Sequence, residues 1–315
     1  MNAASEPGLV SIVIPTYKRA ADLRIAAESA LAQTYPLIEV LIVSDGPDAE
    51  ARAAVEGMDA RLRYMELAQN RGPAEARNAG VRASRGEWLA FLDDDDIMLP
   101  AKIEHQMRLA DATQPQRMIA CCLVYRHDGR EDVQPARPIG PDEDVADYIL
   151  LRPGLMKRPG VLTLQALMVH RSILEAVPFT SHPEHEDWAW FLEAWHLAGA
   201  RVEFVWEPLV IYNIAMDNLS RSRRTNWQDS LRWVERYREW IDGRTAASFL
   251  ATKVALKAKR AGDWQGIRTV YAAMRRSKPG LLEWAFFLGI AMLPNALLQA
   301  AWKRSLRADA EAVNA

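Results

Sequence analysis

The chain has 315 residues, of which 50% are hydrophobic and 25% charged, so it can form a sizeable core in one large domain or two modest ones. A formal net charge of -2 and a pI near 6.3 provide no overall basic field, which argues against nucleic acid as a partner. The only cysteines, Cys121 and Cys122, are adjacent, which suits neither a disulfide framework nor a spaced zinc site and favours a reducing compartment, the cytoplasm. Met1 to Leu9 lack a basic start and an apolar segment, so we expect no secretory signal.

The first hundred residues alternate between two kinds of pattern. Short apolar runs rich in β-branched residues predict buried strands at 9–15, 38–43, 61–67 and 87–92. Helical spacing predicts crossover helices at 20–33 and from Pro73 onward. This alternation predicts an α/β fold with a mixed, mostly parallel central sheet layered by helices, in which right-handed crossovers bring the strand ends to one rim.

The middle of the chain continues the pattern less regularly. Helices are expected at 100–110 and 182–197, and strands at 117–126, 161–170 and 201–212. The stretch 127–141 is rich in Asp, Gly and Pro and predicts a long loop. From about residue 218 helix formers dominate, with helices expected at 226–240, 245–260 and 263–275. We therefore expect an α/β domain at 1–215, a helical extension at 216–280 and a separate C-terminal helix at 281–315.

That last segment is unusually apolar. Residues 281–302 contain one formal charge, Glu283, and a basic tail follows. The length just suffices to span a bilayer, but Pro294 and the amides after it favour a helix lying in the interface, with the tail on anionic headgroups. This predicts peripheral contact through 281–307 at the inner face of the cytoplasmic membrane. A buried packing helix fits the same pattern.

Four consecutive acids, Asp93 to Asp96, follow the strand predicted at 87–92. The carboxyl end of a buried strand delivers side chains to the crevice where open α/β sheets bind ligands. Because clustered carboxylates repel one another, a bound divalent cation explains the run. A solvated acidic turn or a helix cap is the alternative.

Five short blocks carry a family resemblance. They are Ile14-Pro15-Thr16-Tyr17-x-Arg19, Ser44-Asp45-Gly46, Ala76-Arg77-Asn78-Ala79-Gly80, Phe91-Leu92-Asp93-x-Asp95-Asp96 and Glu186-Asp187-Trp188. In this order, over about residues 8–215, they resemble the family 2 glycosyltransferases of bacteria. The resemblance implies a GT-A fold and an inverting, hexosyltransferase-type enzyme that uses a nucleotide-sugar donor.

The resemblance also implies which residues bind the donor nucleotide. They are Pro15, Thr16, Tyr17, Arg19, Asp45, Arg77, Asp93 and Asp94. Tyr17 would cover the base and Asp45 would accept a hydrogen bond from it. Many members have two acids where this chain has Ser44-Asp45, and the retained acid is the one assigned to the base. A UDP-sugar is the default donor. The alternatives are strand-end packing for Thr16 and Tyr17 and a solvated charge for Arg77.

Asp93 and Asp95 match the two acids of the family's Asp-x-Asp motif. By resemblance they hold Mn²⁺ or Mg²⁺, with Asp93 also within reach of the ribose. Such a cation neutralises the charge that develops on the leaving nucleotide. Asp96 would support the metal shell, and Asp94 is the acid most expected to face water.

An inverting transfer needs a base that takes the proton of the acceptor hydroxyl. Asp187 matches the family acid in that role, and Glu186 would hold the acceptor or cap the helix; both are otherwise ordinary first-turn acids. Arg221 and Arg223 are candidates to contact the diphosphate, although a solvated basic face fits as well. The nearby histidines lack a further ligand for zinc.

These features favour a metal-dependent enzyme that moves one sugar to a glycan or lipid-linked acceptor in polysaccharide assembly. A nucleotidyltransferase that makes the sugar nucleotide is one alternative, but it would carry a glycine-rich loop after the first strand, and residues 16–20 contain no glycine. A non-catalytic nucleotide-sugar-binding protein is the other, and the candidate base Asp187 argues against it. The stretch from Gln228 to Trp233 has one residue too many for the Gln-x-x-Arg-Trp signature of processive synthases. We therefore reject a processive synthase.

Overall fold

The computed structural model describes residues 5–111, 114–127, 130–213 and 226–294. The chain forms two compact units. The first comprises Met1–Pro138, Leu162–Ser181 and Glu193–Ile214, and the second comprises Ile139–Val161, His182–Leu192 and Ala215–Ala315. The boundary between them falls within α7 (Glu186–Leu197).

The first unit is built on one sheet that contains nine strands within the described residues. They are β1 (Glu6–Thr16), β2 (Ile38–Ser44), β3 (Leu62–Glu66), β4 (Gly86–Phe91), β5 (Ile97–Met98), β6 (Arg117–His127), β7 (Arg130–Gln134), β8 (Met168–His170) and β9 (Arg201–Asn213). Their order is β3-β2-β1-β4-β8-β6-β9-β5, and β7 pairs with β6. The first four are mutually parallel, as are β6 and β9, whereas β5, β7 and β8 pair antiparallel. The predicted mixed, mostly parallel sheet is confirmed.

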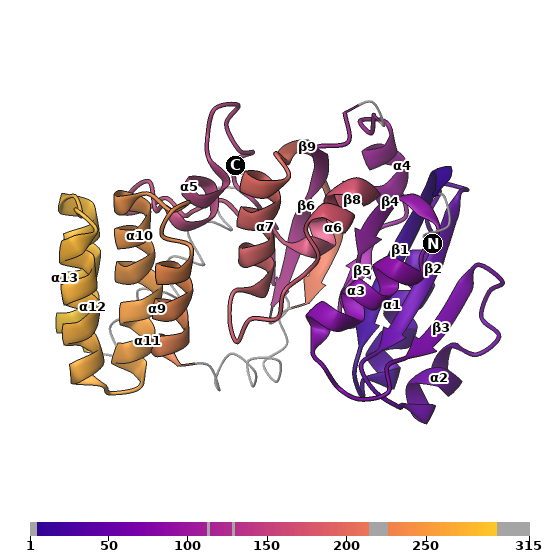
Figure 1. Ribbon diagram of the computed structural model, residues 1–315, viewed down its shortest axis with the longest axis horizontal. Coiled ribbons are helices and arrows are strands. Elements are labelled where there is room, and N and C mark those ends of the chain that lie inside the picture. Colours follow the sequence, from indigo (N-terminus) through magenta and orange to yellow (C-terminus); the bar gives the residue numbers. More distant parts are fainter. Residues whose placement is uncertain (1–4, 112–113, 128–129, 214–225, 295–315) are drawn as a thin grey trace. The chain divides into compact units, whose positions relative to one another are not determined.

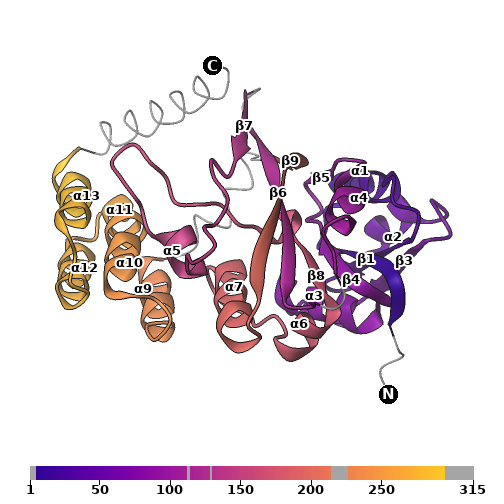
Figure 2. The ribbon, with the colours of Figure 1, turned by 90° about the horizontal axis from the view of Figure 1, so that it is seen from above.

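Helices cover both faces of this sheet. They are α1 (Ala20–Leu31), α2 (Ala49–Val55), α3 (Pro73–Ala83), α4 (Lys102–Met107) and α6 (Arg171–Ala176). In Figure 1 they surround the indigo and purple strands, and in Figure 2 α1 and α4 lie on one face while α3 and α6 lie on the other. The chain moves outward from β1 to β2 to β3 and then returns to β4, so right-handed crossovers send α1 and α3 to opposite faces.

Burial on both faces explains the apolar strands. All seven residues of β2 are buried, as are the last eight of β1. Cys121 and Cys122 are free and buried in β6. A strand that is covered on both sides appears in the sequence as a continuous apolar run. These runs therefore predicted β1, β2 and β4 correctly.

Two predictions for the middle of the chain are wrong. The stretch 127–141 contains β7, which pairs antiparallel with β6; the dipeptide Asp128-Gly129 between the two strands is typical of a β-hairpin turn. The strand predicted at 161–170 is reduced to β8, and Leu164–Ala166 forms a short 3₁₀ turn, η1. In η1 the side chains of Leu164 and Gln165 are both buried, so an apolar run here reflects a packed turn and only a short strand.

The second unit is helical. It contains α5 (Val145–Leu150), α9 (Trp227–Arg236), α10 (Gly243–Phe249), a π-helical stretch η2 (Leu250–Val254), α11 (Ala255–Arg260), α12 (Trp264–Arg276) and α13 (Leu281–Met292), together with the start of α7. α10, η2 and α11 form the continuous helix predicted at 245–260. Of the helix predicted at 281–302, α13 covers Leu281–Met292 and ends at the C-cap Leu293, and residues 295–302 lie outside the described residues. Among the described helices, none has the length and apolar character required to cross a membrane.

Candidate functional site

Three predicted site residues lie at or just beyond the ends of strands that finish at the same edge of the sheet. Thr16 ends β1, Asp45 follows β2 and Asp93 follows β4, and β1 is parallel to both neighbours. Chain order reverses at β1, with β2 on one side and β4 on the other. Open α/β sheets bind ligands at such a switch point, beyond the carboxyl ends of the strands. The topology therefore brings these predicted residues to a ligand-binding edge.

Asp94 does not face water, so that expectation is wrong. Its carboxylate is buried and accepts hydrogen bonds from the Thr16 hydroxyl at 2.7 Å and from the Arg19 guanidinium at 3.1 Å. Asp94 thus joins the end of β4 to the end of β1 and to the start of α1. Burial raises the pKa of its carboxyl to about 6, against the opposing effects of Thr16 and Arg19.

Asp93 is held from the other face of the sheet. Arg77 on α3 donates to Asp93 Oδ1 at 3.1 Å, and the Gln165 amide on η1 donates to Oδ2. The Arg77 side chain is 7% exposed, which excludes a solvated helix charge. Its guanidinium carbon also lies 5.9 Å from the centre of the Phe179 ring. Arg77 therefore orients an acid of the cluster.

Asp95 and Asp96 are fixed by two other elements. Arg19 donates to Asp95 Oδ2 at 2.8 Å. The backbone N–H of Asn213, at the end of β9, donates to Asp96 Oδ1 at 2.9 Å, and the Asn213 amide donates to the carbonyl of Asp95 at 2.7 Å. Asp96 Oδ2 is buried without a hydrogen-bond partner among the described residues. One carboxylate oxygen of Asp96 is thus available to a ligand.

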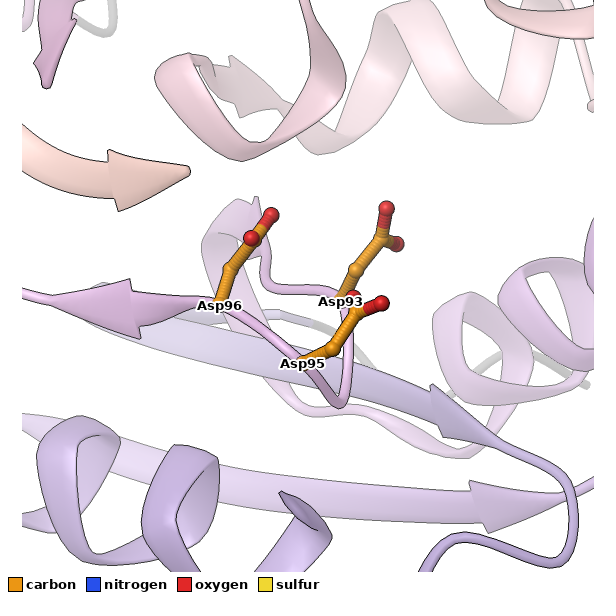
Figure 3. A group of neighbouring side chains, drawn as sticks. All are labelled: Asp93, Asp95 and Asp96. Atoms are coloured by element: carbon orange, nitrogen blue, oxygen red, sulfur yellow. The ribbon is translucent and has the colours of Figure 1, made fainter. Parts of the chain in front are cut away.

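Asp93, Asp95 and Asp96 form a compact set of oxygen ligands. One carboxylate oxygen from each lies within 4.8 Å of the others, and Figure 3 shows the three side chains extending from one short loop. Burial raises the pKa of Asp95 and raises that of Asp96 well above its ordinary value, and the neighbouring charge of Asp93 adds to both shifts. Oxygen ligands at this spacing suit a hard divalent cation, which would relieve the repulsion.

Asp45 and Tyr17 lie beside the acid cluster, at the ends of β2 and β1. Both Asp45 oxygens accept backbone hydrogen bonds, from Arg71 N–H at 2.7 Å and from Gly72 N–H at 2.8 Å. Each oxygen keeps a second lone pair for a ligand. Gly46 has φ of +125°, and a Cβ there would lie 3.7 Å from the Tyr17 ring. The Tyr17 ring therefore lies next to Gly46, the residue that follows Asp45.

The Ala-Arg-Asn-Ala-Gly block has a structural explanation in α3. A Cβ on Gly80 would lie 2.4 Å from Val13 Cγ1, so only glycine lets α3 pack this closely on β1. The Asn78 side chain donates to the carbonyl of Phe179 at 2.8 Å and accepts from its N–H at 3.0 Å. These contacts fix the helix that carries Arg77 under the acid cluster.

The remaining predicted residues belong to the C-terminal part of the chain. Glu186 and Asp187 are half-buried in the first turn of α7 and lie in the second unit. The carbonyl of His185 accepts the first helical hydrogen bond, from Ala189 N–H at 2.8 Å, so the two acids occupy the end of the helix where its dipole favours negative charge. Arg221 and Arg223 lie outside the described residues.

Sequence reasoning missed Gln165 and Asn213. Both are amides that orient acids of the cluster, and they come from η1 and from the end of β9, which lie far from Asp93 in sequence. Asn213 directly follows the strand predicted at 201–212, and that position was the only available signal for it. Gln165 sits inside a stretch predicted as strand, where a single buried amide gives no signal.

A cluster of carboxylates at the switch point of a mixed α/β sheet defines a class of nucleotide- and metal-binding folds. Comparison with known sequences identifies the family. Residues 11–175 match the model of glycosyl transferase family 2, and the chain belongs to that family. A curated relative, the succinoglycan biosynthesis protein ExoO of Rhizobium meliloti, is 39% identical over 122 residues, which cover 38% of this chain and 35% of the relative. The matched stretch spans about a third of the length of the first curated relatives.

Solved structures with the same fold include two that hold a nucleotide sugar. The mannosyltransferase PcManGT of Pyrobaculum calidifontis, in complex with GDP-Man and Mn²⁺, has a TM-score of 0.56 at 16% identity and covers 98% of this chain and 88% of its own. S. aureus TarS 1-349 in complex with UDP-GlcNAc has a TM-score of 0.53 at 16% identity, with 85% and 92% coverage. At this identity the likeness establishes the GT-A-like fold, as expected from the sequence.

Proposed function

We propose that this protein is a metal-dependent, inverting glycosyltransferase that moves one sugar, of hexosyl type, from a nucleotide donor to a glycan or lipid-linked acceptor in polysaccharide assembly. Family membership supports the reaction class. The observation that carries the proposal is the convergence of Asp93, Asp95 and Asp96 at the sheet edge bordered by Thr16 and Asp45. A nucleotide, its diphosphate and a cation need these types of partner together.

The donor would lie along the strand ends. In this proposal the Tyr17 ring covers the base and Asp45 accepts a hydrogen bond from it, while the backbone at Pro15 and Thr16 borders the nucleoside. Arg19 and Arg77 act through the acids to which they donate, and Asp94 acts by accepting hydrogen bonds from Thr16 and Arg19. Their hydrogen bonds pre-organise the loop before a ligand arrives, and such pre-organisation lowers the free-energy cost of binding.

The cation would be held by Asp93, Asp95 and Asp96. The residues fit it, because the set is all oxygen and Asp96 Oδ2 is a buried atom without another partner among the described residues. When bound, Mn²⁺ or Mg²⁺ would neutralise the charge that develops on the leaving diphosphate. Asp95→Asn should weaken Mn²⁺ binding about tenfold or more, measured by calorimetry without donor. Unchanged Mn²⁺ affinity in this variant would remove Asp95 from the metal site.

Asp187 is the proposed base. It would take the proton of the acceptor hydroxyl as that oxygen attacks the anomeric carbon, and Glu186 would help to hold the acceptor. The helix dipole at the start of α7 stabilises the ionised carboxylate that this role needs. Asp187→Asn should abolish transfer while donor binding survives. Full transfer by the variant would eliminate Asp187 as base, and binding without turnover in the wild type would indicate a non-catalytic binding protein.

A panel of nucleotide sugars tests the whole proposal. UDP-sugars are the default donors, and the structural neighbours bind UDP-GlcNAc or GDP-Man, so the panel includes UDP- and GDP-linked sugars. Mass spectrometry with Mn²⁺ present would detect donor hydrolysis or transfer. We expect turnover of at least one donor that is lost on chelation. Turnover that chelation leaves unchanged would refute the metal dependence.

The proposal includes a membrane contact through 281–307, because α13 buries one face and exposes apolar side chains on another. Glu283, Phe287 and Ala291 are buried against the second unit, whereas Leu281 is 91% and Met292 78% exposed. The exposed charged residues of the preceding helix α12 are all basic, and they are Arg268, Arg275 and Arg276. An exposed apolar stripe beside cations suits an anionic bilayer, where a lipid-linked acceptor would be met.

Vesicle flotation tests this contact. Serine at Leu281, Leu288 and Met292 should release the chain from anionic vesicles, as should deletion of 281–315. Serine at Ile25 and Leu37, two exposed apolar residues of the first unit, is the matched control and should leave binding intact. If the triple variant floats like the wild type, the membrane contact is wrong. If the wild type does not bind vesicles and the triple substitution dissociates a dimer, the exposed apolar residues of α13 form an interface between two copies of the chain.

A further inference from the structure

The residue before the proposed base motif has a strained backbone. His185 has φ of +58°, in the left-handed region that non-glycine residues rarely adopt. Its carbonyl accepts the first hydrogen bond of α7, from Ala189 N–H, so the conformation of His185 sets the direction in which the helix starts. Glu186 and Asp187 are the next two residues. Such a conformation persists only when surrounding contacts hold it.

Contacts enclose the His185 side chain within the second unit. Its ring stacks on Trp188, with centroids 4.9 Å apart and an interplanar angle of 6°, and meets Phe249 edge-on at 5.3 Å. Nε2 lies 2.9 Å from the Ser230 hydroxyl and 3.2 Å from Glu184 Oε2. Because Trp188 belongs to the first turn of α7, the imidazole joins that turn to α9 and α10.

Glu184 completes the network. Its side chain is 4% exposed, and its Oε2 accepts hydrogen bonds from the fully buried Ser230 hydroxyl and from the ammonium of Lys257. Lys257 also donates to Ser230 Oγ at 3.0 Å. The opposite charge of Lys257 compensates the buried carboxylate, so removing one partner leaves an unpaired charge. Two consecutive residues are thereby tied to α9 and to α11.

We infer that Glu184, His185, Ser230 and Lys257 form a clamp that positions Asp187 for proton transfer by fixing the start of α7. All four are positioning residues. The inference rests on the role proposed above for Asp187. It also gives the helical C-terminal extension a part in catalysis, since Ser230 and Lys257 both come from it. A base displaced by about 1 Å can lower the rate by about 100-fold without affecting donor binding.

The chain offers a matched pair of variants. Ser230→Ala removes a clamp hydroxyl, whereas Ser248→Ala removes an equally buried hydroxyl of the same unit that donates to the Leu150 carbonyl and accepts from Arg152 N–H. We expect Ser230→Ala to lower kcat about tenfold or more, with the donor KM within about twofold, and Ser248→Ala to retain kcat. His185→Gly, which relieves the strain but loses the imidazole, should behave like Ser230→Ala. Equal kcat in the two serine variants, or full kcat in His185→Gly, would overturn the inference.

Hydrogen exchange provides a readout that does not depend on turnover. In Ser230→Ala the amides of 186–190 should exchange at least about tenfold faster than in the wild type, and in Ser248→Ala they should not. Unchanged exchange in Ser230→Ala would refute the clamp. If no donor is turned over by the wild type, the proposed function fails, and the exchange experiment still decides whether the clamp holds α7.

Discussion

Lys102 is a fully buried lysine that supports the candidate site. It lies on α4, where its ammonium donates to Gln106 Oε1 at 2.8 Å and to the carbonyl of Leu167 at 3.3 Å. Gln106 in turn donates to the carbonyl of Ala166 at 2.8 Å. Together they anchor the turn that presents Gln165 to Asp93. Burial lowers the pKa of Lys102 from 10.5 to about 8, with Cys121 opposing the shift slightly.

The sign of the pH effect follows from this shift. As pH rises, the folded state loses the Lys102 proton before the unfolded state does, so stability increases between the folded pKa and the unfolded pKa. Below about pH 8 the buried charge reduces the free energy of unfolding by its full amount, roughly 3 kcal/mol. Most of this, about 2 to 3 kcal/mol by the linkage relation, is regained as the pH rises from 7 to 10. The Cys121 thiol, whose pKa burial raises to about 11, titrates above this range.

Lys102→Met tests the reasoning by urea unfolding. The free energy of unfolding of the wild type should rise by about 2 to 3 kcal/mol relative to that of Lys102→Met between pH 7 and pH 10. In the variant, Gln106 Oε1 lacks its donor at every pH. This loss changes the free energy of unfolding by a constant amount and does not alter its dependence on pH. Lys18→Met removes an exposed lysine of the same unit and controls for the loss of one charge. Parallel pH profiles for wild type and Lys102→Met would refute a desolvated ammonium at this position.

Three further predictions concern packing and the site. Gly80→Ala should destabilise the chain by about 1–3 kcal/mol in urea, because its Cβ would overlap Val13; Gly289→Ala, with open space around it, should be neutral or stabilising by up to about 1 kcal/mol. Thr16→Val should cost about 1–3 kcal/mol by leaving the buried Asp94 carboxylate short of a donor, and unchanged stability would show that this bond contributes nothing. Gln165→Leu should raise the Mn²⁺ concentration for half-maximal transfer about tenfold, because Asp93 loses a donor that orients it; an unchanged Mn²⁺ dependence would contradict this.

The fold was largely predictable because the chain is locally consistent. β1, β2 and β4 are buried on both faces and therefore appear as continuous apolar runs, and the helices between them show helical spacing. β7 and η1 were mispredicted for different reasons. Within the described part of the chain β7 pairs only with β6, so its pattern is polar, whereas η1 is as apolar as a strand because it is packed in the core.

The site was predictable only as far as its residues follow strand ends. Asp45 and Asp93 are placed by the sheet, so pattern and topology suffice to bring them together. The surroundings of Asp94 depend on the direction in which each carboxylate of the four-residue turn points. Sequence periodicity does not predict these directions. Gln165 reaches Asp93 from 72 positions away, through a tertiary contact that a single sequence does not reveal.

The four acids are tolerated together because each is held by a different element. Asp94 turns back to Thr16 on β1, Asp93 to Arg77 on α3, Asp95 to Arg19 beside α1 and Asp96 to the backbone at the end of β9. Two guanidinium groups compensate part of the negative charge. The pKa values of Asp95 and Asp96 are nevertheless raised, so repulsion and burial are not fully offset by the protein itself. The oxygens of Asp93, Asp95 and Asp96 converge. A divalent cation bound there would relieve the remaining repulsion and so lower the energy of the folded chain.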